Sequence, residues 1–256
     1  MKKKISALIL AALLVAATDA RAQKFSLPDG YDDIRVLLIG NSFTYFHDCD
    51  SMLIQIARSQ GVRIRLGEYL KGGQTFGQHL NLPCTAEAIA AGRYDWAFIQ
   101  DFSNNAALYA RDGEKSVLKN TILLRDRILQ ASPHCRIVLE RTWSYPGNGA
   151  GGFASDRELD KYLQKGASTL SRKAKLPLSP IGNAFATVRS ERPDIGLFEP
   201  DDKHQNASGS YLKCCVNWLI ISGKPFDGDV ATCGLDPQTA AYLRSVAERT
   251  VLSKKK

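Results

Sequence analysis

The chain has 256 residues and a formal net charge of +8 at pH 7, but most of the excess positive charge lies at the two ends. Residues 1–22 hold four basic side chains and one acidic one, and residues 254–256 are all lysine, which leaves about +2 for the rest. A body this close to neutral lacks the broad basic surface of a nucleic-acid-binding protein. We therefore expect no nucleic-acid partner.

The first 22 residues have the pattern of a secretory signal peptide. Lys2–Lys4 precede an apolar stretch from Ile5 to Ala17, and the small residues of Ala20-Arg21-Ala22 form a cleavage site. The apolar stretch is short for a bilayer-spanning helix, although a retained N-terminal anchor is the alternative. We predict a signal peptide at 1–22 and a single domain at 23–256. The protein would be exported to the bacterial periplasm or beyond, without stable membrane insertion after cleavage.

Downstream of the cleavage site, strand-like and helix-like segments alternate. The pattern predicts a buried strand at 34–39, a helix at 50–60, and strands at 62–69 and 95–100. A long amphipathic helix at 116–131, a strand at 136–140 and a helix at 156–175 follow. The proline-interrupted run 176–181 allows only a short or edge strand, and helices at 209–222 and 237–252 close the chain. This alternation predicts an α/β domain, with a parallel sheet covered by helices on both faces.

The turn after the first strand carries the candidate nucleophile, Ser42. An apolar run stops at Gly40, and the sequence Gly40-Asn41-Ser42 would expose the serine hydroxyl at the carboxyl end of the strand. Open α/β sheets build their sites at that edge. A serine hydroxyl is a weak nucleophile and needs a base within hydrogen-bond reach. The alternative is that Asn41 or Ser42 only caps the following helix.

The candidate base lies in Asp201-Asp202-Lys203-His204, near the other end of the chain. Of the four histidines, only His204 has an acid three residues before it, and on a turn this spacing places the Asp201 carboxylate beside the imidazole. The carboxylate can orient the ring while the other ring nitrogen takes the serine proton. Asp202 is a competing orienter, and a solvated loop is the alternative interpretation of the whole motif.

Two further turns supply candidate groups for the oxyanion. Glycine is expected where a backbone amide must approach a ligand closely, and Gly73, with Gly72 as the alternative, follows the second strand. The third strand ends at Gln100, and either its carboxamide or that of Asn104 could offer an N–H to the oxyanion. Each of these residues could instead be an ordinary turn or loop residue.

Two aromatic candidates lie near the same edge of the sheet. Trp143 ends the fourth strand and could stack on a sugar ring, and His79 could line the pocket. For each, packing within the protein is the alternative. The glycine-rich segment 144–152 that follows Trp143 is either a lid or substrate rim or a tolerated surface insertion.

The chain has six cysteines, and export would make disulfides possible. One or two bridges are plausible, for example between Cys233 and either Cys214 or Cys215, and the sequence assigns none. The spacings match no zinc motif. We expect no cofactor. The six positions are Cys49, Cys84, Cys135, Cys214, Cys215 and Cys233.

The order of these segments resembles the SGNH hydrolases, the GDSL-type esterase and lipase superfamily. The Ser42 turn, the glycine pair, the 100–104 segment and Asp201-x-x-His204 look like its first, second, third and fifth blocks. The chain is similar to a branch of secreted bacterial members with Gly-Asn-Ser-Phe-Thr near the start. The resemblance implies a three-layer α/β/α sandwich with a flavodoxin-like, five-stranded parallel sheet, and metal-free Ser-His-Asp chemistry on esters.

Two departures from the family pattern bear on the function. The first block reads Gly-Asn-Ser rather than Gly-Asp-Ser, and the third block lacks Gly-x-Asn-Asp, although Gln100 resembles the glutamine of some carbohydrate esterases. We expect a secreted esterase acting on small acyl esters, especially acetyl esters, of a small molecule or a polysaccharide. The alternatives are a non-catalytic carbohydrate-binding protein on a decayed hydrolase fold, or a lipase or thioesterase.

Overall fold

The computed structural model describes residues 33–253 of the chain. The predicted signal peptide at 1–22 and the three terminal lysines lie outside the described residues. None of the helices within 33–253 is long and apolar enough to cross a membrane.

The centre of the domain is a parallel sheet in the order β2-β1-β3-β4-β5, which confirms the predicted five-stranded sheet and is the flavodoxin-like order. Gly40 pairs with Leu70 and Glu140 with Ser179, so neighbouring strands end at one edge. Prolines flank the last strand, which is short and lies at the sheet edge as predicted. The strands are β1 (Asp33–Gly40), β2 (Arg63–Leu70), β3 (Trp96–Ile99), β4 (Arg136–Glu140) and β5 (Leu178–Ser179).

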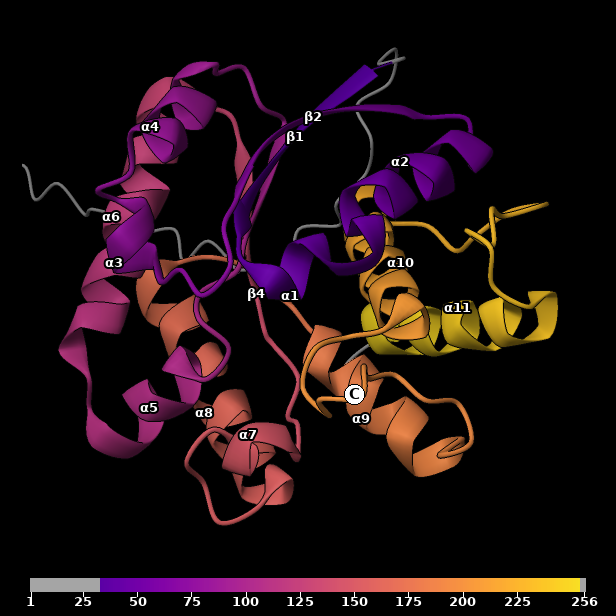
Figure 1. Ribbon diagram of the computed structural model, residues 1–256. Coiled ribbons are helices and arrows are strands. Elements are labelled where there is room, and N and C mark those ends of the chain that lie inside the picture. The colour runs from indigo at the N-terminus through magenta and orange to yellow at the C-terminus, as the bar shows by residue number, and fades with distance from the viewer. Residues whose placement is uncertain (1–32, 254–256) are drawn as a thin grey trace, which may run out of the picture.

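Helices cover both faces of the sheet, which gives the three predicted layers. In Figure 1, α2, α10 and α11 lie on one side of the sheet, and α3, α4 and α6 lie on the other. The first group is α2 (Cys49–Ser59), α10 (Ala207–Ser222) and α11 (Pro237–Leu252). The second is α3 (Phe76–His79), α4 (Pro83–Ala90) and α6 (Lys115–Ala131). Below the carboxyl ends of the strands are α5 (Asn105–Asp112), α7 (Gly147–Ala150), α8 (Asp156–Ala174) and α9 (Ile181–Glu191).

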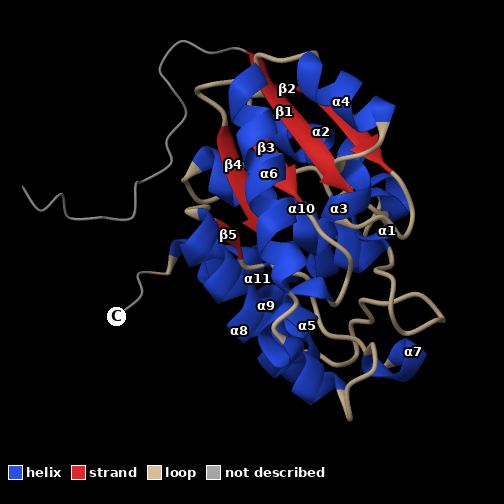
Figure 2. Ribbon diagram, turned by 90° about the vertical axis from the view of Figure 1, so that its left-hand side faces the viewer, coloured by secondary structure: helices blue, strands red, loops and turns tan. Residues whose placement is uncertain are grey.

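The side chains of β1 alternate between two hydrophobic cores, as the pleat of a strand requires. Val36 and Leu38 pack with α2, α10 and α11, whereas Leu37 and Ile39 pack with α4 and α6. Both faces of β1 are therefore buried, and the strand reads as a continuous apolar run. Figure 2 shows the strands running between the two helical layers toward the end of the molecule that holds α1 (Ser42–Tyr45) and α7.

Helix α10 is enclosed by the rest of the domain. Every residue from Gly209 to Ser222 is buried, including Lys213 and Asn217. The helix begins at Asn206, whose side chain accepts the N–H of Gly209 at 3.1 Å. Since this cap lies two residues after His204, the candidate base enters the site directly from the start of a buried helix.

The predicted strands and long helices are confirmed to within two residues, but α3, α4, α5, α7 and α9 were not predicted. Helix α9 illustrates why. A side chain at Gly182 would place its Cβ 2.3 Å from the carbonyl oxygen of Thr142, so close packing requires glycine inside that helix. Glycine is a poor helix former and interrupts the apolar period by which a helix is recognised.

All six cysteines lie within the described residues, and all are free thiols. The bridge that we considered between Cys233 and Cys214 or Cys215 is therefore absent. The sulfur atoms that come close are those of Cys49 and Cys214, at 3.0 Å. Cys49 begins α2 and Cys214 lies in α10, so the contact joins two helices of the same layer.

Candidate active site

The turn at the end of β1 both caps the following helix and presents the Ser42 hydroxyl. Asn41 caps α1, because its side-chain oxygen accepts the N–H of Phe43 at 3.2 Å. Ser42 is the first residue of α1, and its hydroxyl remains available for another partner. The serine thus lies at the carboxyl edge of the sheet, at the N-terminus of a short helix.

Ser42, His204 and Asp201 form a continuous hydrogen-bonded chain. The Ser42 hydroxyl donates to Nε2 of His204 at 2.9 Å, and Nδ1–H of His204 donates to Oδ2 of Asp201 at 2.5 Å. The other Asp201 oxygen accepts the backbone N–H groups of Lys203 at 3.0 Å and His204 at 2.9 Å. The sequence spacing of three residues therefore sets both the tautomer and the orientation of the imidazole. Asp202, the competing orienter, is exposed and does not contact the ring.

Hydrogen bonds keep Asp201 ionised. Burial by itself would raise the pKa of Asp201, but the bonds from the His204 ring and from the two backbone N–H groups hold it below its ordinary value. A carboxylate in this position can stabilise the imidazolium that forms when His204 takes a proton. Solvent reaches the pair, since the Asp201 side chain is 48% exposed and that of His204 is 21% exposed.

Aromatic side chains hold the imidazole from two directions. The ring of Phe46 stacks on His204 with centroids 4.5 Å apart and planes 9° apart. The ring of Phe43 meets the same imidazole edge-on, with centroids 5.6 Å apart. Both phenylalanines come from the segment that follows Ser42, so the nucleophile segment also packs on the base.

The second glycine turn lies beside the nucleophile turn. The Asn41 side-chain amide donates to the carbonyl of Gln74 at 2.9 Å, which fastens the glycine pair to the start of α1. Gly73 has φ +72°, a backbone conformation that favours glycine, and no atom lies within 4 Å of a Cβ built there. Within residues 33–253, the backbone N–H groups of Ser42 and Gly73 have no acceptor. A Cβ at Gly72 would lie 2.9 Å from the Tyr45 hydroxyl.

The two candidate carboxamides of the third block make contacts within the protein. Gln100 is buried, and its oxygen accepts the N–H of Asn41 at 3.1 Å and the hydroxyl of Thr44 at 3.0 Å. Its side-chain N–H group bonds to the Asp101 carbonyl. The side-chain N–H of Asn104 donates to the carbonyl of Gly151 at 2.8 Å. Gln100 therefore braces the Ser42 turn from beneath, and Asn104 fastens the glycine-rich segment.

Trp143 and His79 are buried rather than placed on a rim. Trp143 is 1% exposed and lies stacked between Phe43 and Phe185, at centroid distances of 4.3 and 4.4 Å. Its indole N–H donates to the Lys203 carbonyl at 3.1 Å, next to His204. The ring thus supports the nucleophile segment on one side and the base loop on the other.

His79 is fully buried below β1. Its Nε2–H donates to the carbonyl of Gly40 at 3.0 Å, and its Nδ1 accepts the hydroxyl of Thr85 at 3.0 Å. Burial lowers the pKa of this histidine, and the bond to the Gly40 carbonyl opposes that shift only in part. Neutral His79 therefore anchors the end of the strand that leads to the nucleophile.

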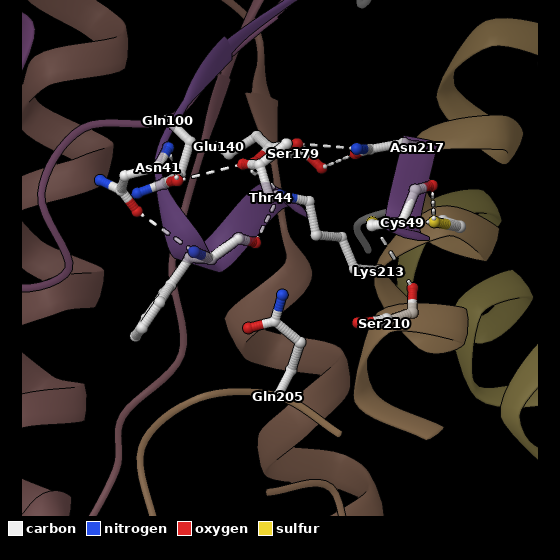
Figure 3. Close-up of polar contacts among 12 residues, drawn as sticks. Asn41, Thr44, Cys49, Gln100, Glu140, Ser179, Gln205, Ser210, Lys213 and Asn217 are labelled. Atoms are coloured by element: carbon white, nitrogen blue, oxygen red, sulfur yellow. Dashed lines mark hydrogen bonds and ion pairs between the residues drawn. The ribbon is translucent and has the colours of Figure 1, made fainter. Parts of the chain in front are cut away.

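The residues that lie beneath α1 were not predicted from the sequence. Lys213 is buried in α10 and pairs with the buried Glu140 at the end of β4 (Figure 3). Gln205, next to His204, donates to the Ser42 carbonyl at 3.3 Å. The signal that could have found Lys213 is a single lysine within an apolar helix, since an unpaired charge there would be costly.

Residues that could ligate a metal are not clustered. Within 33–253, no group of three or more histidine, cysteine, aspartate or glutamate side chains is arranged to hold an ion. The chemistry available at this edge is that of an oriented imidazole, a serine hydroxyl and two unpaired backbone N–H groups. Together they can deprotonate a hydroxyl nucleophile and stabilise an oxyanion.

The sheet order, the helical layers and the strand-end site define an α/β fold of the SGNH-hydrolase type, which several solved structures share. A DUF4886-family protein from Bacteroides uniformis matches with a TM-score of 0.71 and 18% identity, over 88% of this chain and 97% of its own. A protein from Slackia heliotrinireducens, provisionally assigned to the SGNH hydrolases, matches at 0.60 and 21%, over 75% of this chain and 100% of its own.

An acetyl xylan esterase from Geobacillus stearothermophilus matches with a TM-score of 0.55 and 17% identity, over 76% of this chain and 97% of its own. No protein-family profile matches the sequence, and no curated protein does. At these identities the likeness establishes the fold alone.

Proposed function

We propose that this protein is an exported serine esterase that hydrolyses small acyl esters, acetyl esters in particular, carried by a carbohydrate. The observation that supports the proposal most strongly is the hydrogen-bonded chain from Asp201 through His204 to Ser42, which joins residues 162 positions apart. A serine within hydrogen-bond reach of an oriented imidazole is the arrangement that nucleophilic acyl transfer requires.

In the proposed reaction, His204 removes the proton from Ser42 as the serine oxygen attacks the ester carbonyl. The backbone N–H groups of Ser42 and Gly73 donate to the developing oxyanion, and Asp201 stabilises the imidazolium. His204 then gives its proton to the departing alcohol, which leaves an acyl-serine. Water attacks this intermediate with His204 again acting as the base, and release of the acid restores the enzyme.

The proposed carrier is a carbohydrate outside the cytoplasm. The predicted signal peptide supports export, and two proteins of similar fold are described as acetyl xylan esterases. Because Gln100 and Asn104 use their carboxamides elsewhere, the proposed oxyanion donors are the backbone N–H groups of Ser42 and Gly73, which have no acceptor among the described residues. The mature chain would begin at Gln23, which intact-mass measurement of the exported protein would test.

The decisive experiment measures hydrolysis of p-nitrophenyl acetate by residues 23–256 and by the Ser42→Ala and His204→Ala variants. We expect each variant to lose at least about a thousandfold in kcat. Ser51→Ala is the matched control, because Ser51 lies on α2 and its hydroxyl, as far as residues 33–253 show, bonds to Gln55. Unchanged activity in Ser42→Ala would refute the mechanism.

The substrate class is tested separately with acetylated xylooligosaccharides and with p-nitrophenyl octanoate. Release of acetate from the oligosaccharide, with octanoate cleaved more slowly than acetate, is the expected result. Faster cleavage of the octanoate would instead favour a lipase.

A further inference from the structure

Beneath the nucleophile helix α1 lies a buried group of polar and charged side chains that the proposed ester hydrolysis does not use. These residues come from the ends of three strands, from α1 and from α10, and Figure 3 shows them gathered around Thr44. We call them the α1 support network: Thr44, Gln100, Glu140, Ser179, Lys213 and Asn217, all buried.

Lys213 connects α10 to the residues that follow the nucleophile. Its ammonium group donates to the Phe43 carbonyl at 2.9 Å, to the Thr44 hydroxyl at 2.9 Å and to Oε2 of Glu140 at 2.7 Å. All three N–H groups are used, so the buried charge is fully hydrogen-bonded. Since Phe43 follows Ser42 directly, this lysine holds the backbone one residue from the nucleophile.

Both carboxylate oxygens of Glu140, the partner of Lys213, accept hydrogen bonds. Its second oxygen accepts the side-chain N–H of Asn217 at 2.7 Å, and the Asn217 oxygen accepts the Ser179 hydroxyl at 2.9 Å. Asn217 lies four residues after Lys213, so both side chains project from one face of α10. The helix is thereby fixed to the ends of β4 and β5.

The network also reaches the turn that precedes the nucleophile. Thr44 accepts from Lys213 and donates to Gln100, whose oxygen in turn accepts the N–H of Asn41. At the other end, Asn206, the N-cap of α10, lies two residues after His204. One helix therefore carries the base at its start and holds the nucleophile segment through its second turn.

Stability alone does not account for this ion pair. Both side chains are 2% exposed, and a buried pair can often be replaced by apolar residues at little or no cost in stability. What the pair supplies is a fixed, directional connection between two segments that must meet within hydrogen-bond distance. A displacement of about 1 Å at a catalytic group can lower a rate about a hundredfold.

We propose that Lys213 and Glu140 are positioning residues for Ser42, which keep the serine hydroxyl in reach of His204 by fixing α1 against α10. The proposal rests on the esterase function proposed above. It assigns the pair no contact with substrate.

The test replaces both charges together, in Lys213→Met/Glu140→Leu, so that no buried charge is left unpaired. We expect a folded protein with kcat for p-nitrophenyl acetate lowered about 10- to 100-fold and KM changed less than about twofold. The rate at which an organophosphonate modifies Ser42, followed by mass spectrometry, should fall by a similar factor, because it depends on the same serine–imidazole geometry.

A milder pair of variants keeps the test informative if the double variant does not fold. Thr44→Val removes the hydroxyl that joins Lys213 to Gln100, whereas Thr44→Ser retains it. We expect Thr44→Val to lower kcat several-fold at unchanged KM, and Thr44→Ser to restore it.

Arg141→Met is the matched control, since Arg141 is a buried cation paired with Asp160 at 2.6 Å that does not contact α1. It should lower the melting temperature and leave kcat within about twofold.

Two results would overturn the proposal. A folded double variant, or Thr44→Val, with wild-type kcat and wild-type phosphonylation would show that the network is structural only. In that case Ser42→Ala would still be inactive, and the esterase function would stand. A wild-type protein that neither cleaves esters nor reacts with the phosphonate would refute both the esterase function and the positioning role that rests on it.

Discussion

The two halves of the site are held in opposite ways. The segment of Ser42 is supported from within the domain, by side chains that lie between 56 and 170 positions away in the sequence. The acid–base pair is held mainly by its own loop, because Asp201 bonds to the ring and backbone of His204 and to the next backbone N–H. Asn41 and Thr44 beside the serine are buried, whereas Ser42 and His204 are both partly exposed and Asp201 is open to solvent.

The two sides of the site therefore differ in what keeps their side chains in position. Hydrogen bonds within one loop can be read from its sequence, whereas a residue held by distant side chains depends on the whole fold. We therefore expect substitutions on the base side to lower activity with little loss of stability. Substitutions on the nucleophile side should lower both.

The largest expected effect comes from Asp201→Asn. The neutral amide cannot stabilise the imidazolium, so kcat should fall by roughly 10²- to 10⁴-fold. Because the Asp201 side chain is about half exposed, the melting temperature should change little. Steady-state kinetics and thermal unfolding on one preparation would check both. A large fall in melting temperature would show that the base loop is not self-supporting.

Trp143→Ala should mainly cost stability. The indole fills the space between Phe43 and Phe185, and removing a buried tryptophan costs about 3–5 kcal/mol of unfolding free energy. Urea unfolding would measure the loss. If Trp143 instead stacked on sugar, the variant would keep its stability and bind acetylated oligosaccharides more weakly, with a raised KM. Phe153→Ala, at a buried ring outside this stack, is a comparison for the stability cost alone.

The Gln100→Leu variant tests whether Gln100 supports the Ser42 turn or donates a hydrogen bond to the oxyanion. If Gln100 supports the turn, its loss leaves the Asn41 N–H without an acceptor. The free energy of unfolding should then fall by about 1–3 kcal/mol, with a smaller fall in kcat. A residue that donated to the oxyanion would show the reverse, a fall of about 10²- to 10³-fold in kcat at unchanged stability. Urea unfolding and p-nitrophenyl acetate kinetics of the same variant would decide between the two.

The smallest expected effect is a pH dependence of stability caused by His79. Burial lowers its pKa in the folded state, so the unfolded chain binds the proton more tightly and acid favours unfolding. This contribution is fully favourable above the unfolded pKa, about 6.5, and declines as the pH falls toward the folded value. The difference in melting temperature between the wild type and His79→Gln should therefore change between about pH 7.5 and 5.5. An identical pH profile in the two proteins would contradict the assignment.

Local patterns predicted most of the fold and the candidate residues Ser42, Asp201 and His204, which the structure brings together. The apolar run before Gly40 and the Asp201-x-x-His204 spacing each act over a few residues, so they could be read without knowing the tertiary structure. The helices α3 and α5, of four and eight residues, are too short to show a period, and α9 contains a glycine required by close packing.

Contacts between residues far apart in the sequence determine the side-chain positions that local patterns did not predict. Trp143 and His79 were predicted as candidates for the pocket because they follow strand or turn motifs, yet both are buried by side chains far away in the sequence. Gln100 has a suitable chemical group at the correct edge, but its carboxamide points toward Asn41 and Thr44. The orientation of a polar side chain at a strand end depends on hydrogen-bond partners from distant segments, which a local sequence pattern does not predict.

The enclosure of α10 has a consequence for the order in which the protein gains activity. A chain that ends before residue 222 lacks the complete helix α10, which follows His204 and carries Lys213. On the proposed mechanism, both residues are needed for activity. The nucleophile would be present early in synthesis, but its support and its base would arrive only with the last fifth of the sequence. A nascent or partly translocated chain would therefore be inert toward cellular esters, and hydrolysis would begin only when α10 inserts into the completed fold.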